Sequence, residues 1–298
     1  MDCPARNRKL VEDRSKVPHR RSGRKVLPMK EDASGTKDEW DDTPRVDTSW
    51  IPLEQEQLYR ICLGCLMENR IPFILAGAFA LYAYTGIQRN TKDLDVFLPA
   101  EHVRPALIAL NAKGLRTEVR DGLWLAKAHK DPYFVDLIFA NPNKEIQIDM
   151  GWIRRSNKVE LFDMRVPLIA LEELIISKIY VARMDRFDGA DICHLIRGSK
   201  GRIDWHWLSR CLGRDQELLL WHFVLFQYVY PGHVHLLPTP LMDRIYESMA
   251  GHRTNPPPEK TFRGTLIDPE SFEVDCRLWG YEDIRDTKPL VSEDGSRM

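Results

Sequence analysis

The chain has 298 residues, and its 43 basic and 44 acidic residues give a formal net charge of −1. Because these charges nearly cancel, the overall balance does not predict a polyanionic partner. Hydrophobic residues at 43% and charged residues at 29% are typical of a folded globular protein, and no apolar run approaches the roughly 20 residues of a membrane-spanning helix. We therefore expect one large domain or two small ones, and no membrane partner.

Residues 1–47 differ in composition from the rest of the chain. The part up to Lys30 is strongly basic, whereas Glu31 to Asp47 is mostly acidic. Large apolar residues are few, so this block cannot bury enough apolar surface to offset its ordering entropy, and we expect it to be disordered. A solvated tail is the favoured interpretation, and a basic arm that contacts RNA or DNA is the alternative. A signal peptide requires an apolar segment after its basic residues, and no such segment follows them here. We therefore expect a cytoplasmic protein.

The first predicted helix covers residues 53–69 and contains Cys62 and Cys65. These two residues form the chain's one Cys-x-x-Cys pair, so a zinc site would lack the second pair. Positions three apart share a helix face, where cysteine behaves as a small hydrophobic residue. We therefore favour packing of both thiols in the core over metal binding or redox chemistry.

The most informative stretch runs from Phe73 to Leu98. It begins with a short apolar run, residues 73–76, which is typical of a buried strand, and Gly77 follows at once. A helical pattern then continues to about Gly86. In residues 93–98, acidic and apolar residues alternate before the run becomes fully apolar. This order predicts a strand, a turn into a helix, and a second strand.

Asp93 and Asp95 lie on the same face of the second strand, because successive strand side chains point to opposite faces. Two carboxylates on one face repel each other unless a cation lies between them, and oxygen ligands at this spacing suit Mg²⁺. The turn at Gly77 offers unpaired backbone N–H groups at a helix N-terminus, where a phosphate can bind. Together these features predict a nucleotide-transfer site. The alternative is an exposed edge strand with two solvated acids beside a plain turn.

This stretch resembles the nucleotidyltransferase fold of the DNA polymerase beta superfamily. The family hallmark is an apolar-Gly-(Gly/Ser) turn that opens a helix, then an Asp-x-Asp strand, then a third carboxylate on a later strand. The form Arg89-x-Thr91-x-Asp93-x-Asp95 is similar to the branch that contains AbiEii-type toxins and small antibiotic nucleotidyltransferases. Ala78 stands where the family usually has Ser or Gly, so the backbone N–H is kept and a hydroxyl contact to phosphate is lost. The resemblance implies an α/β (α+β) fold, a mixed sheet with flanking helices, followed by a C-terminal helical domain.

A lone acid in a later strand is the candidate for the third carboxylate. We expect a helix over residues 100–113 and then strands near 115–119, 123–129 and 133–139. Asp136 lies among apolar residues of the last strand, where an unpaired carboxylate is costly. The resemblance implies that Asp136 binds the catalytic metal and accepts the proton of the attacking hydroxyl. Asp149, in another strand-like run, is the competing candidate.

The second half of the chain is predicted to be helical. A helix over residues 167–183 carries Lys178 among apolar neighbours, and Asp188 and Asp191 follow, three apart on one face of the next helix. The toxin branch has a similar block. The resemblance implies that Lys178 contacts the triphosphate and that an acid places the acceptor or the lysine. The alternative is a surface cluster of salt bridges.

Further helices are expected within residues 204–230 and near 241–249, and their aromatic residues are interpreted as core. We predict four segments: a disordered segment (1–47), a catalytic domain (48–165), a helical domain (166–250), and an extended, partly docked tail (251–298).

The resemblance implies a Mg²⁺-dependent enzyme that moves a nucleotidyl group from an NTP to an acceptor hydroxyl and releases pyrophosphate. The acceptor could be a small molecule, a tRNA or a protein. Two Mg²⁺ ions would be held by Asp93, Asp95 and Asp136. Backbone at Gly77 and Ala78, together with Arg89, Thr91 and Lys178, would hold the nucleotide. The alternative is a catalytically inactive nucleotide-binding or regulatory module of the same fold, which the residue at position 78 favours.

Overall fold

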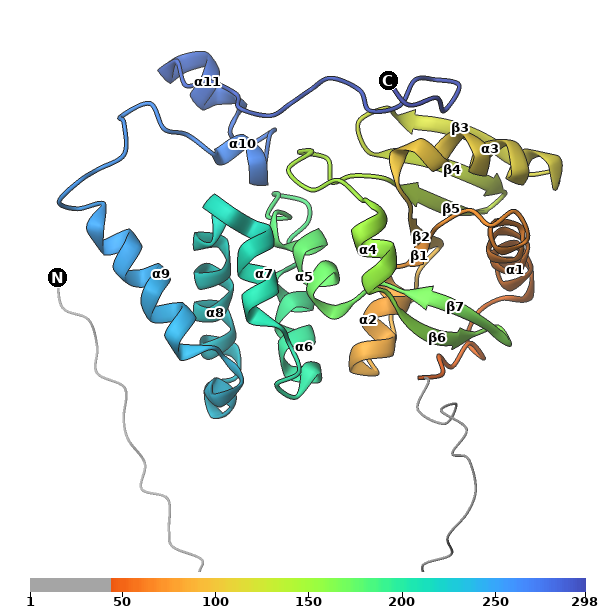
Figure 1. Ribbon diagram of the computed structural model, residues 1–298, viewed down its shortest axis with the longest axis horizontal. Coiled ribbons are helices and arrows are strands. Elements are labelled where there is room, and N and C mark those ends of the chain that lie inside the picture. The colour runs from red at the N-terminus through yellow and green to blue at the C-terminus, as the bar shows by residue number, and fades with distance from the viewer. Residues whose placement is uncertain (1–43) are drawn as a thin grey trace, which may run out of the picture. The chain divides into compact units, whose positions relative to one another are not determined.

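The computed structural model describes residues 44–298, which belong to a compact unit of residues 42–298 (Figure 1). Most of the block predicted to be disordered therefore lies outside the described residues. The last residues of that block are packed: Val46 is buried and its backbone N–H donates to the carbonyl of Glu160 at 3.0 Å.

A mixed sheet forms the centre of this unit and confirms the predicted fold class. Its strand order is β3-β4-β5-β2-β1-β7-β6. The β2–β5 and β1–β7 pairs are parallel, and the remaining neighbours are antiparallel. The strands are β1 (Ile74–Leu75), β2 (Asp93–Phe97), β3 (Arg116–Asp121), β4 (Leu125–Lys130), β5 (Tyr133–Ile138), β6 (Asn157–Leu161) and β7 (Met164–Leu168).

Helices cover the sheet and continue beyond it. The helices of the first half are α1 (Leu53–Glu68), α2 (Gly77–Thr85), the 3₁₀ helix η1 (Ala100–His102), α3 (Val103–Ala112) and α4 (Met150–Arg155). Those that follow the sheet are α5 (Leu171–Ile179), α6 (Gly189–Ser199), α7 (Trp205–Leu212), η2 (Gly213–Asp215), α8 (Glu217–Val229), η3 (Pro231–Leu236) and α9 (Thr239–Gly251). No helix of the described part of the chain is long and apolar enough to cross a membrane.

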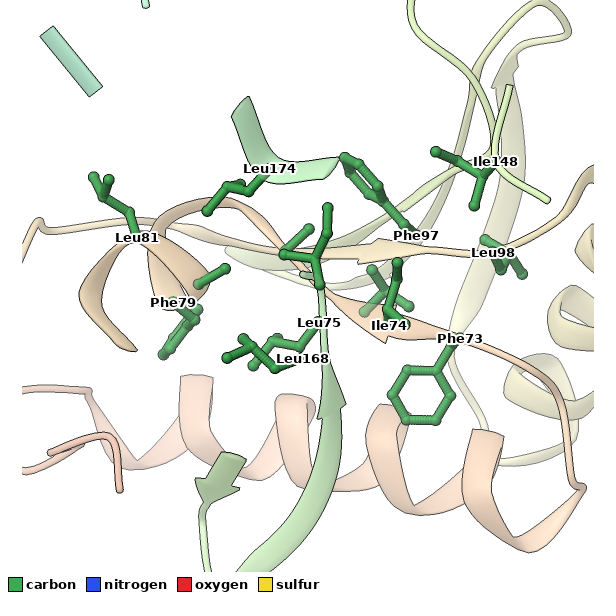
Figure 2. Close-up of a cluster of buried hydrophobic side chains, with 14 of the residues drawn as sticks. Phe73, Ile74, Leu75, Phe79, Leu81, Phe97, Leu98, Ile148, Leu168 and Leu174 are labelled. Atoms are coloured by element: carbon green, nitrogen blue, oxygen red, sulfur yellow. The ribbon is translucent and has the colours of Figure 1, made fainter. Parts of the chain in front are cut away.

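The residues that lead into the turn at Gly77 belong to the apolar core. Leu75 of β1 is the parallel partner of Leu168 of β7, and both are almost fully buried. Figure 2 shows these two side chains next to each other and Phe73 pointing toward a helix, while Leu174 of α5 approaches from the opposite side. This packing fixes β1, and therefore the position at which the chain leaves the sheet to start α2.

The sequence patterns missed one hairpin of the sheet. Strands β6 and β7 pair antiparallel, with Lys158 opposite Pro167, and Leu168 then pairs with β1. The helix predicted to begin at residue 167 therefore begins at Leu171. The apolar residues before it fit a buried strand as well as a helix turn, and their pairing with β1 decides between the two.

Residues 251–298 contain two short helices, α10 (Gly264–Ile267) and α11 (Glu273–Trp279). The final segment lies against the β3–β4 turn, where the backbone N–H groups of Leu290 and Val291 donate to the carbonyl of Gly122 at 2.8 and 3.1 Å. Val291 is buried there, and Lys144 pairs with Asp286 at 3.0 Å. The domain boundaries at residues 165 and 250 stay predictions.

The cysteine pair of α1 lies in the core. Cys62 and Cys65 are both buried, and neither forms a disulfide. Burial raises the pKa of the Cys62 thiol. Raised pKa values keep thiols protonated and unreactive, so the geometry favours the packing interpretation.

Candidate active site

Parallel pairing of β2 and β5 brings the three predicted carboxylates together. Asp95 is the direct partner of Asp136 in the register, and Asp93 is two residues before Asp95 on the same strand face. One carboxylate oxygen from each of the three residues lies within 4.8 Å of the others. The sequence alternation and the strand pairing together therefore produce an acidic cluster.

The cluster is electrostatically unfavourable by itself. The pKa of Asp95 is raised to about 7, first because its carboxylate is removed from solvent and then because Asp93 and Asp136 repel its charge. Burial also raises the pKa of Asp136. Three hard oxygen donors that repel one another around one point form a set that suits Mg²⁺. The residues therefore fit the divalent metal that the sequence resemblance implies.

The raised pKa of Asp95 predicts a pH-dependent stability. In the folded protein this pKa is about 7, well above the ordinary value of 3.8 for an aspartate. The folded state therefore holds the proton more tightly than the unfolded chain does, and the stability that this proton contributes is lost as the pH rises through about 7. We expect the melting temperature of the metal-free protein to fall between about pH 5 and about pH 8, and saturating Mg²⁺ to abolish most of this fall.

Calorimetry of wild type and Asp95→Asn, each with and without Mg²⁺, checks this prediction. The Asn variant lacks the titrating group, so its melting temperature should change much less over the same pH range. A fall of equal size in both proteins would show that other groups cause it.

Gly77 allows the chain to pass very close to the acidic cluster. It adopts a left-handed φ of +59°, and a Cβ atom built there would lie 1.7 Å from Oδ2 of Asp95. The preceding Ala76 donates its N–H to the Asp95 carbonyl at 2.9 Å. Only glycine fits both the conformation and the contact. Helix α2 starts at this glycine, so its free N–H groups lie beside the carboxylates.

The loop before β2 is held by the predicted Thr91 and by Gln55, a residue that the sequence analysis missed. The hydroxyl of Thr91 hydrogen-bonds the carboxylate of Asp93, and the Thr91 carbonyl accepts from Nε2 of Gln55 at 2.7 Å. Gln55 is buried and also hydrogen-bonds the Tyr59 hydroxyl at 2.6 Å. A glutamine on the buried side of an otherwise apolar helix was the available signal, since a buried amide needs partners.

Lys127 is a second residue that the sequence analysis missed. It lies opposite Asp136 in the β4–β5 register, and its Nζ is 2.6 Å from Oδ1 of that carboxylate. The same ammonium group lies 4.0 Å from the centre of the Phe134 ring. Lys127 lowers the pKa of Asp136 against the effect of burial. One oxygen of Asp136 is thus paired with a cation of the protein itself.

The helical half contributes a network of buried charges. Lys178 donates to Asp188 at 3.1 Å and pairs with Asp191 at 2.8 Å, and these three residues are 7%, 7% and 5% exposed. A surface cluster of salt bridges is therefore the wrong interpretation. Asp188 is the N-cap residue of α6, and Asp191 lies in its first turn, so the two acids reach the lysine from the helix start.

Two arginines complete this network. Arg89, from the loop before β2, pairs with Asp191, and Arg186 donates to both oxygens of Asp188 at 2.9 Å. Arg186 and Lys178 also act on the charge of Asp95, because both lower its pKa. The network therefore joins α5 and α6 to the loop that precedes β2.

The acidic cluster, the Gly77 turn and the charge network of Lys178 line one cleft of about 400 Å³. Its lining includes every residue that the sequence analysis named as a site candidate: Gly77, Ala78, Arg89, Thr91, Asp93, Asp95, Asp136, Lys178, Asp188 and Asp191. The competing acid, Asp149, does not line it. Asp149 caps the N-terminus of α4, where its Oδ1 accepts from the N–H groups of Gly151 and Trp152 at 2.7 and 3.1 Å. Geometry therefore favours Asp136 as the third carboxylate.

Comparison with known families gives one sequence match. The model of the family described as "Nucleotidyltransferase of unknown function (DUF6036)" matches residues 65–228, which is more than half of the chain. This range includes all the site candidates named above. No curated protein matches the sequence.

Solved structures of several nucleotidyltransferases are similar to the chain. They include the lincosamide antibiotic adenylyltransferase LnuA with bound lincomycin (20% identity, 48% of this chain and 95% of that chain, TM-score 0.35). They also include ANT(2″)-Ia in complex with adenylyl-2″-tobramycin (18% identity, 59% of this chain and 99% of that chain, TM-score 0.36). A third is an antigenic nucleotidyltransferase-like protein from Paracoccidioides brasiliensis (14% identity, 55% of this chain and 88% of that chain, TM-score 0.35).

Proposed function

Because the chain belongs to this nucleotidyltransferase family, we propose that it is a Mg²⁺-dependent enzyme that transfers a nucleotidyl group from an NTP to an acceptor hydroxyl. One observation carries the proposal. Carboxylate oxygens of Asp93, Asp95 and Asp136 gather within 4.8 Å, in a cleft that also contains a helix N-terminus and a buried lysine. These are the parts that phosphoryl-group chemistry needs: a metal site, anion donors and a cation.

The triphosphate binds at the start of α2. Backbone N–H groups at Gly77 and Ala78 face the cleft without partners in the helix, and the helix dipole adds positive potential there. Lys178 and Arg89 also line the cleft and supply positive charge to it. Asp188 and Asp191 hold Lys178 in place, which keeps its ammonium group ordered before the nucleotide arrives.

Asp93, Asp95 and Asp136 would hold the metal. When bound, Mg²⁺ neutralises their mutual repulsion and supplies charge stabilisation to the oxygens of the reacting phosphate. Thr91 and Gln55 keep Asp93 in position through the loop before β2. Gly77 leaves the space that the Asp95 carboxylate occupies.

The reaction is an in-line displacement at the α-phosphorus. The acceptor oxygen forms a bond to that phosphorus as the bond to the bridging oxygen breaks, and pyrophosphate leaves with the electron pair. Asp136 accepts the proton of the acceptor hydroxyl, and its raised pKa makes it a stronger base than an ordinary aspartate. Lys127 pairs with Oδ1 of Asp136 and holds this carboxylate in position.

A second function, that of an inactive nucleotide-binding module, is favoured by Ala78. This residue lines the cleft at the turn, where a serine would add a hydroxyl donor to the phosphate. The backbone N–H is the same for both residues. Binding without turnover is the outcome that distinguishes this module from the enzyme.

The test is a pyrophosphate-release assay with each of the four NTPs and Mg²⁺. Total tRNA, aminoglycosides, lincosamides and neutral hydroxyl compounds are added in turn as acceptors. Release that depends on both Mg²⁺ and an acceptor is the expected result. Tight binding of Mg²⁺-NTP without release from any acceptor would support the inactive module, and absence of NTP binding would contradict both functions.

A further inference from the structure

A second hollow lies beside the catalytic cleft, between the helical half and the C-terminal residues. We call it the tail pocket. It has a volume of about 360 Å³ and its apolar wall consists of Tyr180, Leu218, Phe262, Leu266, Ile267 and Phe272. This size and this apolar lining are typical of small-molecule sites. Helix α10, which provides part of the wall, lies near the start of α8 in Figure 1, and Leu218 of α8 lines the pocket with it.

A smaller gap lies between the tail pocket and the cleft. A gap of about 40 Å³ shares Tyr180, Leu266 and Ile267 with the tail pocket. The same gap shares Asn141 and Pro142, which follow β5, with the cleft. The gap therefore connects residues that follow the strand of the third carboxylate with the wall of the tail pocket.

The charges at the tail pocket are paired with one another. Asp215 is 4% exposed, accepts from the Tyr180 hydroxyl at 2.9 Å and pairs with Arg263 at 3.5 Å. Glu217 also pairs with Arg263, at 3.1 Å, and Arg214 lies 3.9 Å from Asp215. Of the charged residues, Asp215, Glu217 and Arg263 line the pocket, so its lining carries a net charge of −1, which disfavours a polyanion. The rest of the wall is apolar and suits an uncharged ring.

Hydrogen bonds connect the part of the wall that the tail forms to the rest of the protein. Asn143 donates from Nδ2 to the Leu266 carbonyl at 2.9 Å, and the N–H of Met184 donates to Oδ2 of Asp268 at 3.2 Å. Asp268 and Leu266 are both buried. The tail residues of the wall lie beyond residue 228, where the family match ends. The pocket therefore depends on residues outside the matched region.

We propose that the tail pocket binds the apolar ring portion of the acceptor, an uncharged ring compound whose hydroxyl group reaches the cleft through the gap. This inference rests on the proposed transferase function for its choice of acceptor. It separates the roles of the two hollows: the cleft binds Mg²⁺-NTP, and the tail pocket selects the molecule to be modified.

The probe is 2-naphthol, an uncharged bicyclic ring compound with one hydroxyl group, and its fluorescence reports binding. Ile267→Trp fills the tail pocket and should weaken 2-naphthol binding at least tenfold. Val274→Trp is the matched control, because Val274 lies on α11, is 40% exposed and does not line the pocket. Phe262→Ala, which removes an aromatic contact surface from the wall and does not fill the pocket, should also weaken binding.

Binding of Mg²⁺-NTP, measured on the same proteins, should be unchanged in all three variants. Failure of NTP binding in wild type would contradict the proposed function. The 2-naphthol measurement would still decide whether the tail pocket binds a ring compound. The inference is overturned if 2-naphthol does not bind, or if wild type and both pocket variants bind it equally. It is also overturned if a tRNA or an aminoglycoside is the acceptor and its KM is unchanged in Ile267→Trp.

Discussion

Replacing Asp93 by asparagine is expected to lower acceptor-dependent pyrophosphate release by about three orders of magnitude, while the fold is kept. The substitution removes one anionic ligand from the acidic cluster, so the metal stabilises the transition state less. Each loss of about 1.4 kcal/mol in this stabilisation lowers the rate tenfold, and several kcal/mol are expected to be lost. The side chain is only partly buried, and asparagine keeps the oxygen that accepts from the Thr91 hydroxyl. The melting temperature of the metal-free protein should therefore stay the same or rise, because one repelling charge is gone.

Asp185→Asn is the matched control for this experiment. Asp185 is exposed in the loop between α5 and α6, does not line the cleft, and has no ion pair within residues 44–298. Its replacement removes the same charge near the same site, so its rate should equal that of wild type. A wild-type rate in Asp93→Asn would show that the acidic cluster does not hold the catalytic metal.

Replacing Gly77 by alanine is expected to abolish activity at a modest cost in stability. The new methyl group would occupy the position of the Asp95 carboxylate, since the Cβ would lie 1.7 Å from Oδ2 and 2.5 Å from Cγ. The Asp95 side chain must then leave the cluster, and activity should fall as far as in Asp93→Asn. The left-handed conformation at a φ of +59° adds a strain of about 1–2 kcal/mol.

Gly86→Ala separates strain from the steric clash. Gly86 also has a left-handed conformation, with a φ of +70°, but a Cβ there would meet no atom within 4 Å. Both variants should lose about 1–2 kcal/mol in the free energy of unfolding, measured by denaturant titration, because both place alanine in the left-handed region. Only Gly77→Ala should lose activity. Equal activity in the two variants would contradict the role given to the space beside Gly77.

The parts of the site that could be predicted from sequence are those with a local signal. Asp93 and Asp95 alternate with apolar residues on one strand, and Gly77 lies between an apolar run and a helix. Asp136 is an isolated acid in an apolar run, which is a weaker signal, because Asp149 had the same property. The parallel register that pairs Asp95 with Asp136 separates the two acids, and Asp149 instead caps α4.

The missed features depend on contacts between distant parts of the chain. Lys127 is one lysine among many until β4 pairs with β5 and places it opposite Asp136. The strand at residues 164–168 has the apolar character of the helix that follows it, and pairing with Leu75 was needed to identify it. The tail pocket combines residues near 180, 217 and 265, whose proximity no local pattern encodes.

Anomalous diffraction from crystals grown with Mn²⁺ and pyrophosphate tests the central claim most directly, because it locates the metal and the phosphate groups in one experiment. The predicted result is a metal peak coordinated by carboxylate oxygens of Asp93 and Asp95, with the pyrophosphate at the N-terminus of α2 beside Gly77 and Ala78. A metal peak elsewhere in the molecule, with no density between these carboxylates, would contradict the assignment of the cleft as the nucleotidyl-transfer site.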